Sequence, residues 1–491
     1  MKLLGKLALG AVAIVALLVA VVLIRTFTWK PPAAVDLTAV RLADAPAIDQ
    51  ARAAARLSEA VRFRTISNQE EAANDWAEWD RLHAWLAATY PAAHAAMVRE
   101  ILPNKALLYT WAGSDPSLKP IVLMAHQDVV PITPGTEKDW RHPPFAGDIA
   151  DGAVWGRGAI DDKGSLVAIF EALDALAASG FKPKRTVIVV SGQDEETGGT
   201  GAQAAAALLI SRGVKAEWVL DEGSAAVTEH PITGGPAAII GVAEKGYATL
   251  RVTARAPGGH SSAPPKETGV GTLAKAITAI SEDQFPLELK GPGADMVRAL
   301  APEAGFVMRM ALANEWLFGP MIKSQFAKTP ASAALLHTTI APTMLRGSPK
   351  ENVLPQDATA WINYRIAPGQ TRDDVMARAR RAVKGLDVEL AWEGAALSNP
   401  SPVSGTDTAG WRVIAALASE GGRLAVAPGL VGAGTDSRYM TGVSDSIYRY
   451  QPLMAPLDTF AMIHGTNERM TLENLSRMTT FYARLVATAA G

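Results

Sequence analysis

Histidine and acidic side chains follow three short apolar runs in this sequence of 491 residues. The three groups are His126-Gln127-Asp128, Asp194-Glu195-Glu196 and Asp221-Glu222. In an open α/β sheet, ligands gather at the carboxyl ends of the strands. If the apolar runs are strands of one sheet, a histidine and several carboxylates meet at a single edge of that sheet.

Further acids and a second histidine extend this pattern. The glycine-rich segment 156–164 contains Asp161 and Asp162 and opens a predicted helix, and His464 lies near the C-terminus. So many carboxylates at one edge repel one another unless metal ions neutralise them. Because the chain has no cysteine, histidine and carboxylate must be the ligands, which suits zinc, cobalt or manganese. Two metals about 3.5–4 Å apart need a bridging carboxylate, and one further acid must stay free as the general base.

Taken singly, each motif has an ordinary structural explanation. A His-x-Asp segment is typical of a loop, Asp-Glu-Glu of a solvated turn, and Asp-Asp-Lys of a helix cap. A single histidine such as His464 more often has a structural role. The joint occurrence of these motifs, each after a strand or a glycine-rich turn, indicates a two-metal site.

These motifs resemble those of the co-catalytic di-zinc exopeptidases and deacylases. The family includes glutamate carboxypeptidase, aminoacylase, acetylornithine deacetylase and succinyl-diaminopimelate desuccinylase. The resemblance covers nearly everything from about residue 50 to the C-terminus. Within the family, the chain is most similar to carboxypeptidase S and the secreted N-fatty-acyl-amino-acid hydrolases. They share the N-terminal apolar segment, a large insertion in the second domain, and Leu220-Asp221-Glu222-Gly223.

The resemblance implies roles for the acids and histidines. Asp161 would bridge both metals, and the Asp161–Asp162 peptide would be cis. Glu195 would be the general base, and Asp128 would orient His126. Five protein ligands for two zinc ions are implied, with His126 and Asp221 on the first metal, Glu196 and His464 on the second, and Asp161 on both.

The resemblance also implies residues outside the metal site. Within 258–262, His260 matches a histidine that reaches a neighbouring subunit's site and stabilises the tetrahedral oxyanion; an ordinary turn histidine is the alternative. An arginine is the natural bidentate partner of a free carboxylate, and the sequence leaves two arginines open for that role. The positions that would hold the substrate carboxylate and carbonyl oxygen are Asn352, Arg365, Gly434, Thr435 and Arg438.

The implied reaction is hydrolysis of an amide or peptide bond next to a free carboxylate. Glu195 would take a proton from a metal-bridging water, whose pKa the zinc ions lower. The resulting hydroxide would attack the amide carbonyl, and Glu195 would pass the proton to the leaving amine. The substrate stays open between a short peptide, cut at its C-terminal residue, and an N-acyl amino acid.

Other classes of protein fit the sequence less well. A non-catalytic, membrane-anchored binding protein on the same fold should have lost ligands or the base, and every expected position is filled. A metal-free glycosidase with paired carboxylates leaves His126 and His464 unexplained. A serine hydrolase would need a Gly-x-Ser-x-Gly motif, which the sequence lacks. The formal net charge of −2 argues against a nucleic-acid binder.

Strands and helices that could position these residues alternate along the chain. The apolar runs 121–125, 186–190 and 218–220 predict strands, and the stretches between them predict helices. This order predicts an α/β domain with a mixed, largely parallel sheet. From 249–254 onward, a β-α-β-β-α-β order predicts an inserted α+β, ferredoxin-like lid or dimerisation domain, so a homodimer through this domain is an open expectation.

The predicted domains follow from these elements. A stretch of the insertion either lines an apolar entrance or packs in a core; its apolar residues are Met308, Met310, Leu312, Trp316, Leu317 and Phe318. The predicted organisation is an N-terminal membrane anchor or signal segment (1–30), a linker (31–47), a catalytic domain in two parts (48–246 and 397–491), and the inserted domain (247–396) with an extra insertion at about 282–334.

An unbroken apolar run extends from Leu7 to Ile24, with Lys2 and Lys6 before it and Arg25 and Lys30 after it. Its 18 residues at about 1.5 Å each span roughly 27 Å, enough for a bilayer's hydrocarbon core. The run is longer than the apolar region of a cleaved signal peptide, and no small-x-small site follows it. We therefore expect an uncleaved membrane helix with a periplasmic catalytic domain, although the flanking charges nearly balance.

Overall fold

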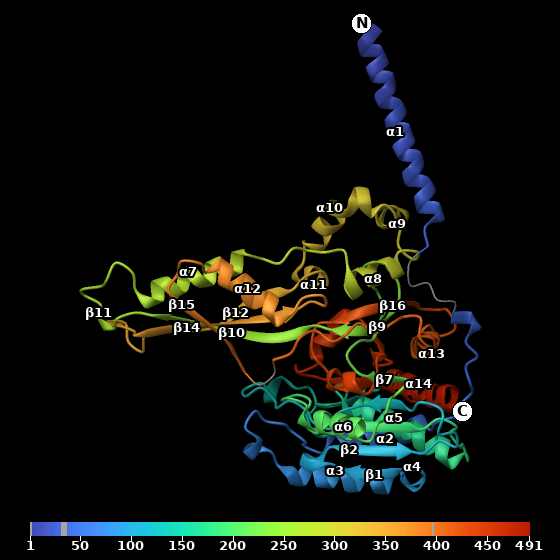
Figure 1. The fold of residues 1–491 in the computed structure, drawn as a ribbon. Helices are drawn as coiled ribbons and strands as arrows, with labels where there is room; N and C mark the ends of the chain where they lie inside the picture. Colours follow the sequence, from blue (N-terminus) through green and yellow to red (C-terminus); the bar gives the residue numbers. More distant parts are fainter. Residues whose placement is uncertain (1, 31–36, 395–396) are drawn as a thin grey trace.

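Within residues 2–30, 37–394 and 397–491, which the computed structural model describes, a ten-stranded mixed sheet forms the centre of the main body (Figure 1). β3 runs parallel to β6 and β7, and β7 parallel to β17, whereas β1 and β2 form an antiparallel edge. The predicted mixed, largely parallel α/β sheet is therefore confirmed. The order is β1 (Val98–Ile101), β2 (Leu107–Trp111), β6 (Val187–Ser191), β3 (Ile121–Met124), β7 (Trp218–Asp221), β17 (Ile447–Arg449), β9 (Ala237–Glu244), β8 (Ala226–Val227) and β18 (Met454–Ala455), with β16 (Ala425–Val431) beside β9.

Helices cover both faces of this sheet, which is why its central strands are apolar throughout. α2 (Gln50–Val61), α5 (Lys163–Ala178) and α14 (Leu472–Ala490) pack in the core on one face. α6 (Thr200–Ser211) packs on the other face with the 3₁₀ helix η5 (Asp436–Gly442). The central strands β3, β6 and β7 are thus buried on both sides, and the loops that follow them remain open for chemistry.

The region 48–90, which the sequence predicts as helical, contains two separate helices. α2 ends at Val61, and α3 (Trp76–Thr89) starts afresh at Asp75, whose side chain accepts a hydrogen bond from the Ala77 amide at 3.2 Å. A short helix, α4 (Pro91–Ala96), follows. The two antiparallel strands β1 and β2 come next, and the sequence reasoning did not predict them.

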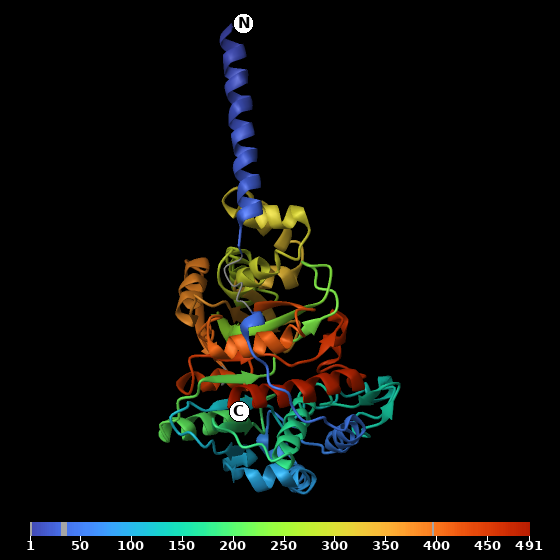
Figure 2. The same ribbon diagram turned by 90° about the vertical axis from the view of Figure 1, so that its right-hand side faces the viewer.

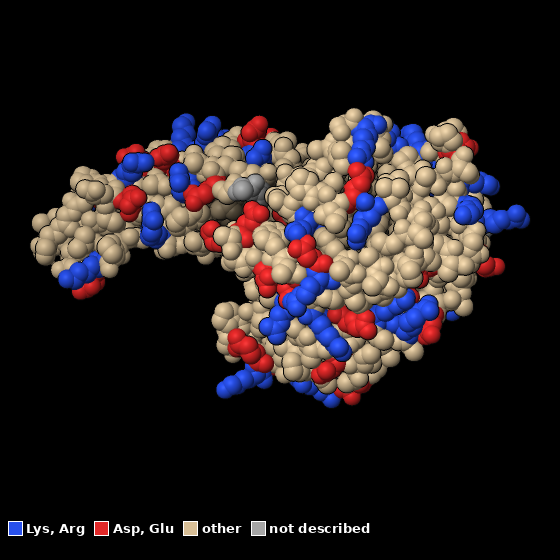
Figure 3. Space-filling view, turned by 90° about the horizontal axis from the view of Figure 1, so that it is seen from below, with Lys and Arg blue, Asp and Glu red and all other residues tan. Residues whose placement is uncertain are grey.

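A second sheet forms a unit that projects from the main body, and we call residues 246–393 the inserted unit (Figures 1 and 3). Its four strands are antiparallel in the order β12-β14-β10-β15, and α7 and α12 pack in its core. This is the β-α-β-β-α-β order expected from the sequence. At its far end, two short strands, β11 (Gly259–His260) and β13 (Val353–Leu354), pair with each other. The longer elements are β10 (Gly246–Arg255), α7 (Gly269–Glu282), β12 (Thr339–Arg346), β14 (Asp357–Ile366), α12 (Arg372–Ala382) and β15 (Val388–Glu393).

The expected insertion consists of four helices between α7 and β12. They are α8 (Gly291–Leu300), α9 (Phe306–Ala313), α10 (Glu315–Phe326) and α11 (Pro330–Ala334). α8, α9 and α10 do not pack in the core of the second sheet; their core is shared with β9 and β16 of the main sheet. Leu312 is buried in this core, Met308 and Phe318 pack against it, and Trp316 and Leu317 are exposed.

One helix stands apart from the rest of the chain. α1 (Lys2–Thr28) projects from the end of the molecule that carries α9 and α10 (Figures 1 and 2). The segment Leu4–Thr28 has a mean hydropathy of 3.2 in its most apolar window. By length and composition, it is the one helix of the described residues that could cross a bilayer.

Candidate metal centre and substrate pocket

The fold gathers the predicted acids and histidines at one edge of the main sheet. His126 follows β3, Glu195 and Glu196 follow β6, and Asp221 is the last residue of β7. Since β3 lies between β6 and β7 and is parallel to both, their carboxyl ends meet. Ligand atoms of His126, Asp161 and Glu196 all lie within 4.8 Å of one another.

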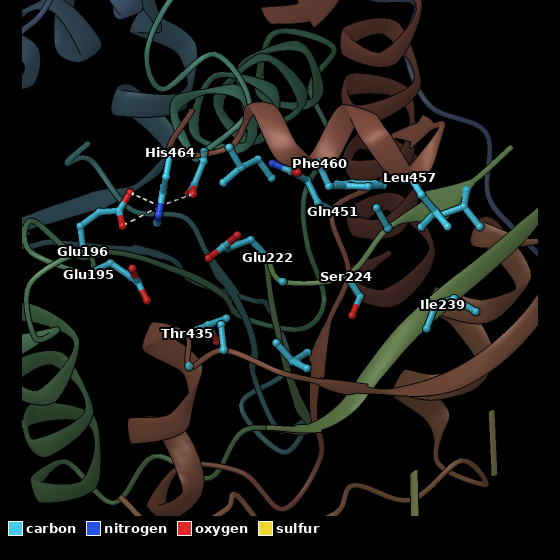
Figure 4. Close-up of a pocket in the computed structure, with 18 of the residues that line it drawn as sticks. Glu195, Glu196, Glu222, Ser224, Ile239, Thr435, Gln451, Leu457, Phe460 and His464 are labelled. Carbon is cyan, nitrogen blue, oxygen red and sulfur yellow. Dashed lines mark hydrogen bonds and ion pairs between the residues drawn. The ribbon is translucent and has the colours of Figure 1, made fainter. Parts of the chain in front are cut away.

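Asp161 lies between the two predicted histidine ligands. His126 Nε2 is 2.8 Å from its Oδ1, and His464 Nε2 is 3.2 Å from its Oδ2. The same His464 nitrogen is 2.9 Å from Glu196 Oε2 (Figure 4). The Asp161–Asp162 peptide is cis, as the resemblance implied. One carboxylate therefore presents an oxygen to each histidine, which is the geometry a bridging ligand needs.

The backbone at Asp161 is fixed by Glu468, to which the sequence reasoning gave no role. Glu468 Oε1 accepts hydrogen bonds from the amides of Ile160 and Asp161, at 2.9 and 3.1 Å. Its other oxygen, Oε2, accepts from Arg157 Nη1 at 2.7 Å, and both side chains of this pair are buried. The motif 464–469 thus supplies a histidine and also the acid that positions Asp161.

Asp128 is fully buried and orients both a histidine and a loop. Its Oδ1 is 3.2 Å from His126 Nδ1 and accepts from the Glu195 amide at 3.1 Å. Its Oδ2 accepts from the Glu196 amide at 3.1 Å and from the Ser67 hydroxyl at 2.5 Å. The carboxylate therefore ties the loop after β6 to the loop after β3, and so fixes His126 relative to the two glutamates.

The crowding of acids and histidines in the cluster shifts the pKa values of Glu195 and His464. Burial, together with the nearby Asp436 and Glu196 carboxylates, raises the pKa of Glu195 well above its ordinary value, despite the opposing charge of His126. Hydrogen bonds to Asp161 and Glu196 raise the pKa of His464 to about 10. A divalent cation would relieve the crowding of carboxylates and displace the histidine protons. This donor set therefore fits a hard or borderline cation such as zinc.

Asp221 and Glu222 are neighbours that lie in different surroundings. Asp221 is buried, and its Oδ2 accepts from the Ser437 amide of η5 at 2.8 Å. Glu222 lines the cavity beside the cluster and points into it (Figure 4). Burial and the charges of Asp161 and Asp162 raise the pKa of Glu222 well above its ordinary value. The sequence reasoning gave Glu222 no role.

The alternation of side chains along β7 could have indicated this difference. Trp218 and Leu220 pack in the core on one face of the sheet, and Val219 packs in the core on the other. Asp221 shares its face with Val219 and reaches η5 beneath the site. Glu222 comes after the strand has ended and faces the cavity.

The cavity next to the cluster has a volume of about 450 Å³. One side carries the acids and His464, together with Gly434 and Thr435. Ile239, Leu457 and Phe460 lie on the opposite side (Figure 4), and the other apolar residues that line the cavity include Val227, Val431 and Ile463. The sequence predicts that the stretch 308–318 either lines an apolar entrance or packs in a core. None of its residues lines this cavity. Leu312 is buried in the core of the insertion, and Met308 and Phe318 pack against that core.

Two predicted residues lie far from the cluster within the same chain. His260 is exposed in β11, at the far end of the inserted unit (Figure 1). Its Nδ1 accepts from the Ser262 amide at 3.1 Å. The Asn352 carbonyl accepts from the Ser261 amide at 3.1 Å, which keeps Asn352 beside His260. The structure therefore brings these two residues together but does not bring them to the metal cluster.

The two candidate arginines lie on either side of the junction between the main body and the inserted unit. Arg438 Nη2 is 3.5 Å from the Gly198 carbonyl, in the loop after Glu196. A Cβ atom on Gly434 would lie 2.3 Å from Arg438 Nη1, so a side chain at this position would displace the guanidinium. Arg365 in β14 lies over the Tyr247 ring at 4.7 Å. Burial lowers the pKa of Arg365.

Comparison with known proteins identifies relatives over most of the chain. Residues 122–488 match the family model "Peptidase family M20/M25/M40". The chain is 33% identical over 472 residues to "Probable carboxypeptidase S-like 2" of Dictyostelium discoideum, which covers 94% of this chain and 89% of that protein. It is 36% identical over 396 residues to the human "N-fatty-acyl-amino acid synthase/hydrolase PM20D1", with 79% and 78% covered.

Solved structures show the same fold at lower identity. The M20 family metallo-carboxypeptidase Sso-CP2 from Sulfolobus solfataricus superposes with a TM-score of 0.64 at 16% identity, covering 88% of this chain and 98% of that one. Human carnosine dipeptidase 1 superposes with a TM-score of 0.61 at 15% identity, covering 89% and 96%.

Proposed function

The chain belongs to peptidase family M20/M25/M40 and is a metal-dependent, carboxypeptidase-like hydrolase of amide bonds, and we propose that it holds two zinc ions and cleaves amides next to a free carboxylate. The observation that carries this proposal is Asp161, whose two oxygens face His126 and His464 separately. A carboxylate shared in this way is what a two-metal site requires. The non-catalytic binding protein considered from the sequence is thereby set aside.

The ligands follow from the contacts around Asp161. His126 would hold one metal, His464 and Glu196 would hold the other, and Asp161, which lies within 3.2 Å of both histidines, would be shared. The sequence assigned Asp221 to the metal of His126. We propose instead that Glu222 supplies that carboxylate, because Glu222 faces the cavity whereas Asp221 accepts a hydrogen bond from the Ser437 amide. Asp221 then positions the loop that bears Glu222.

When bound, the zinc ions would lower the pKa of water and polarise the amide carbonyl. Glu195 is the proton carrier: its amide is held by Asp128, and its carboxylate points into the cavity. It takes a proton from water as the amide is attacked, and delivers that proton to the departing nitrogen.

The substrate carboxylate needs a cation that is not already neutralised. Although burial opposes the shift, Tyr439 and the nearby Glu195 and Asp436 carboxylates raise the pKa of Arg438. Among the described residues, neither arginine forms an ion pair within 4.0 Å, but no acid is among the groups that shift the pKa of Arg365, and its neighbour Lys245 adds positive charge. We therefore propose Arg365 as the bidentate partner of the substrate carboxylate. Arg438, held against Gly434, would then orient the carbonyl oxygen.

His260 and Asn352 would act on the cavity of a second copy of the chain. Both lie at the far end of the inserted unit, away from the cluster. β12 forms an open edge of the second sheet, with Met344 and Leu345 60% and 67% exposed. Such an edge favours pairing with another strand. A homodimer through the inserted unit would cover this edge and could bring His260 to the partner's site as an oxyanion donor.

The apolar wall of the cavity favours an N-acyl amino acid over a polar dipeptide. Ile239, Leu457 and Phe460 offer hydrocarbon surface opposite the acids, and Val227, Val431 and Ile463 add to the apolar lining. Burying an acyl chain gains about 0.8 kcal/mol per CH₂ group. Several relatives carry the name N-fatty-acyl-amino acid synthase/hydrolase. With α1 as an uncleaved anchor, the enzyme would work at a membrane, on its periplasmic side.

The experiment compares two substrates on the full-length, zinc-loaded protein. A long-chain N-acyl amino acid and a polar dipeptide are assayed side by side, each with its carboxylate free and amidated. We expect turnover of the acyl amino acid to exceed that of the dipeptide, and amidation to abolish it. Replacing Arg365 with methionine should raise KM for the free acid more than the same change at Arg438. Equal turnover of free and amidated substrates would contradict the proposed carboxylate recognition.

A further inference from the structure

The C-terminal end of α1 rests against the α9–α10 junction. Asn314 Nδ2 donates hydrogen bonds to the Val22 carbonyl and to Thr26 Oγ1, both at 3.2 Å. Arg25 Nε donates to the Ala313 carbonyl at 3.4 Å. Val22 and Thr26 are buried in this contact, although most of α1 is exposed. The helix therefore meets the body of the protein where its apolar run ends.

Helices α9 and α10 expose apolar side chains beside this contact. On their inner side, both helices are buried in the core that they share with β9 and β16. Scattered exposed apolar residues are ordinary, but these are grouped on two helices at the base of α1 (Figures 1 and 2). We call them the α9–α10 face, and they are, with their exposed fractions, Phe306 (49%), Val307 (68%), Trp316 (57%), Leu317 (38%) and Met321 (43%).

The charges of these helices are mostly positive. Between Phe306 and Lys328 the charged residues are Arg309, Glu315, Lys323 and Lys328. Glu315, the one acid, is neutralised by Arg298, whose Nε lies 2.7 Å from Glu315 Oε1. Apolar residues flanked by unneutralised bases are typical of helices that lie in a bilayer interface and contact anionic headgroups.

We propose that the α9–α10 face lies in the lipid–water interface of the same bilayer that α1 crosses. The proposal rests on the proposed membrane crossing of α1. Trp316 suits this position because indole rings concentrate at headgroup level. The Phe27 ring, at the end of α1, lies 6.0 Å from the Phe306 ring and joins the membrane helix to this face.

Interfacial seating would hold the substrate cavity at a fixed distance from the lipid. α8 joins α9 and α10 to β9 and β16 through one shared core. Ile239 of β9 and Val431 of β16 line the apolar wall of the cavity. The α9–α10 face is therefore connected to the cavity through α8 and the strands β9 and β16, so seating of this face in the interface would fix how far the cavity lies from the lipid.

Because the sequence has no cysteine, a single introduced cysteine can be labelled specifically to measure how deeply that position lies in the bilayer. The full-length protein is inserted into phosphatidylcholine–phosphatidylglycerol vesicles, with one cysteine introduced at a time and carrying an environment-sensitive fluorophore. Val307→Cys, Trp316→Cys and Met321→Cys report on the α9–α10 face. Val98→Cys, on the strand β1 at the opposite end of the body (Figure 1), is the matched control, since Val98 is also 66% exposed. Val15→Cys reports on α1.

Quenching by spin-labelled lipid gives the result. We expect labels at 307, 316 and 321 to be quenched several-fold more than the label at 98, and more strongly when phosphatidylglycerol is present. If the label at 15 is quenched while those at 316 and 321 match the control, the α9–α10 face is in water and the proposal is wrong. If the label at 15 is itself unquenched, the membrane crossing has failed. If the labels at 307, 316 and 321 are not quenched by the lipid but quench one another when the protein density is high, the face contacts a second chain instead, and the proposal is wrong.

Discussion

His126 and His260 are expected to act on the same amide bond, yet their surroundings differ sharply. His126 is 2% exposed, and both of its ring nitrogens are engaged, by Asp128 and by Asp161. His260 is exposed in a strand of two residues, and only its Nδ1 has a partner, the Ser262 amide. The metal cluster is thus assembled by the fold of one chain, whereas the far end of the inserted unit remains separate from it.

The loops of the cluster and the β11–β13 pair differ in how many buried contacts fix their backbones. The loops of the cluster follow buried strands, and buried Asp128 and Glu468 tie their backbones together. The pair β11–β13 has two residues per strand and an exposed surface. Regions with few buried contacts open at low cost in free energy. The proposed metal ligands therefore lie on the rigid part, whereas His260, in its proposed role, would have to reach the site by movement or from another subunit.

The largest effect should come from the cluster. Replacing Glu195 with glutamine removes the proton carrier and should lower kcat on the order of 10²–10⁴-fold. Metal content should be unchanged, because Glu195 is not among the proposed ligands. The matched control is Glu229→Gln, which changes an exposed glutamate and should leave kcat as it is. Full activity in the Glu195 variant would remove this residue from the mechanism.

A smaller loss is expected at the far end of the inserted unit. Replacing His260 with alanine should cost about 10²–10³-fold in kcat, as for the loss of one oxyanion donor, with metal content and melting temperature unchanged. Mixing this variant with Glu195→Gln chains tests where His260 acts. Mixed dimers contain one site with both residues intact, so part of the activity should return. No recovery in proven mixed dimers would mean that His260 acts within its own chain.

Asp221, the last residue of β7, and Glu222, directly after it, can be compared as candidate metal ligands. Glu222→Gln should remove a ligand and lower zinc affinity more than Asp221→Asn does. The Asp221 variant loses a supporting contact, for which about 10–100-fold in affinity is typical. Competition with a chromophoric chelator measures both values. A larger loss in the Asp221 variant would restore Asp221 as the ligand.

The smallest effect concerns pH. In the metal-free protein, hydrogen bonds to Asp161 and Glu196 raise the pKa of His464 from 6.5 to about 10. A raised pKa means that the stabilisation is complete below pH 6.5 and is lost as the pH rises towards 10. The melting temperature of the metal-free protein should therefore fall over this range, and His464→Gln should flatten the fall. Bound zinc should also flatten it, because the metal takes the place of the proton.

Much of the fold could be predicted because its signals are local. The apolar runs at β3, β6 and β7 and the alternation in β10 mark strands, and Thr371 with Asp374 marks the start of α12 by a capping box. β1 could not be predicted in the same way, because it is largely exposed and lacks an apolar run. β2 is largely buried and mostly apolar, so its signal was present in the sequence but was missed.

The site was predictable where residue type alone decides the role. The motifs around Asp161 and His464 predict that both are metal ligands, and the two side chains lie 3.2 Å apart. Whether Asp221 or Glu222 faces the cavity depends on where β7 ends and on the contact with Ser437, which comes from a distant part of the chain. Likewise, Met308 and Leu312 are apolar whether they line a cavity or pack in a core, so only the packing on β9 and β16 separates the two possibilities.

The most direct test of the central claim is the number of metal ions bound per chain, measured by elemental analysis of the full-length protein and of Asp161→Ala. If Asp161 bridges two metals, the parent protein should hold about two zinc ions per chain, and the variant should hold neither while keeping its circular dichroism spectrum. A folded variant that still binds two zinc ions, or a parent protein that binds none when zinc or cobalt is supplied, would contradict the two-metal account.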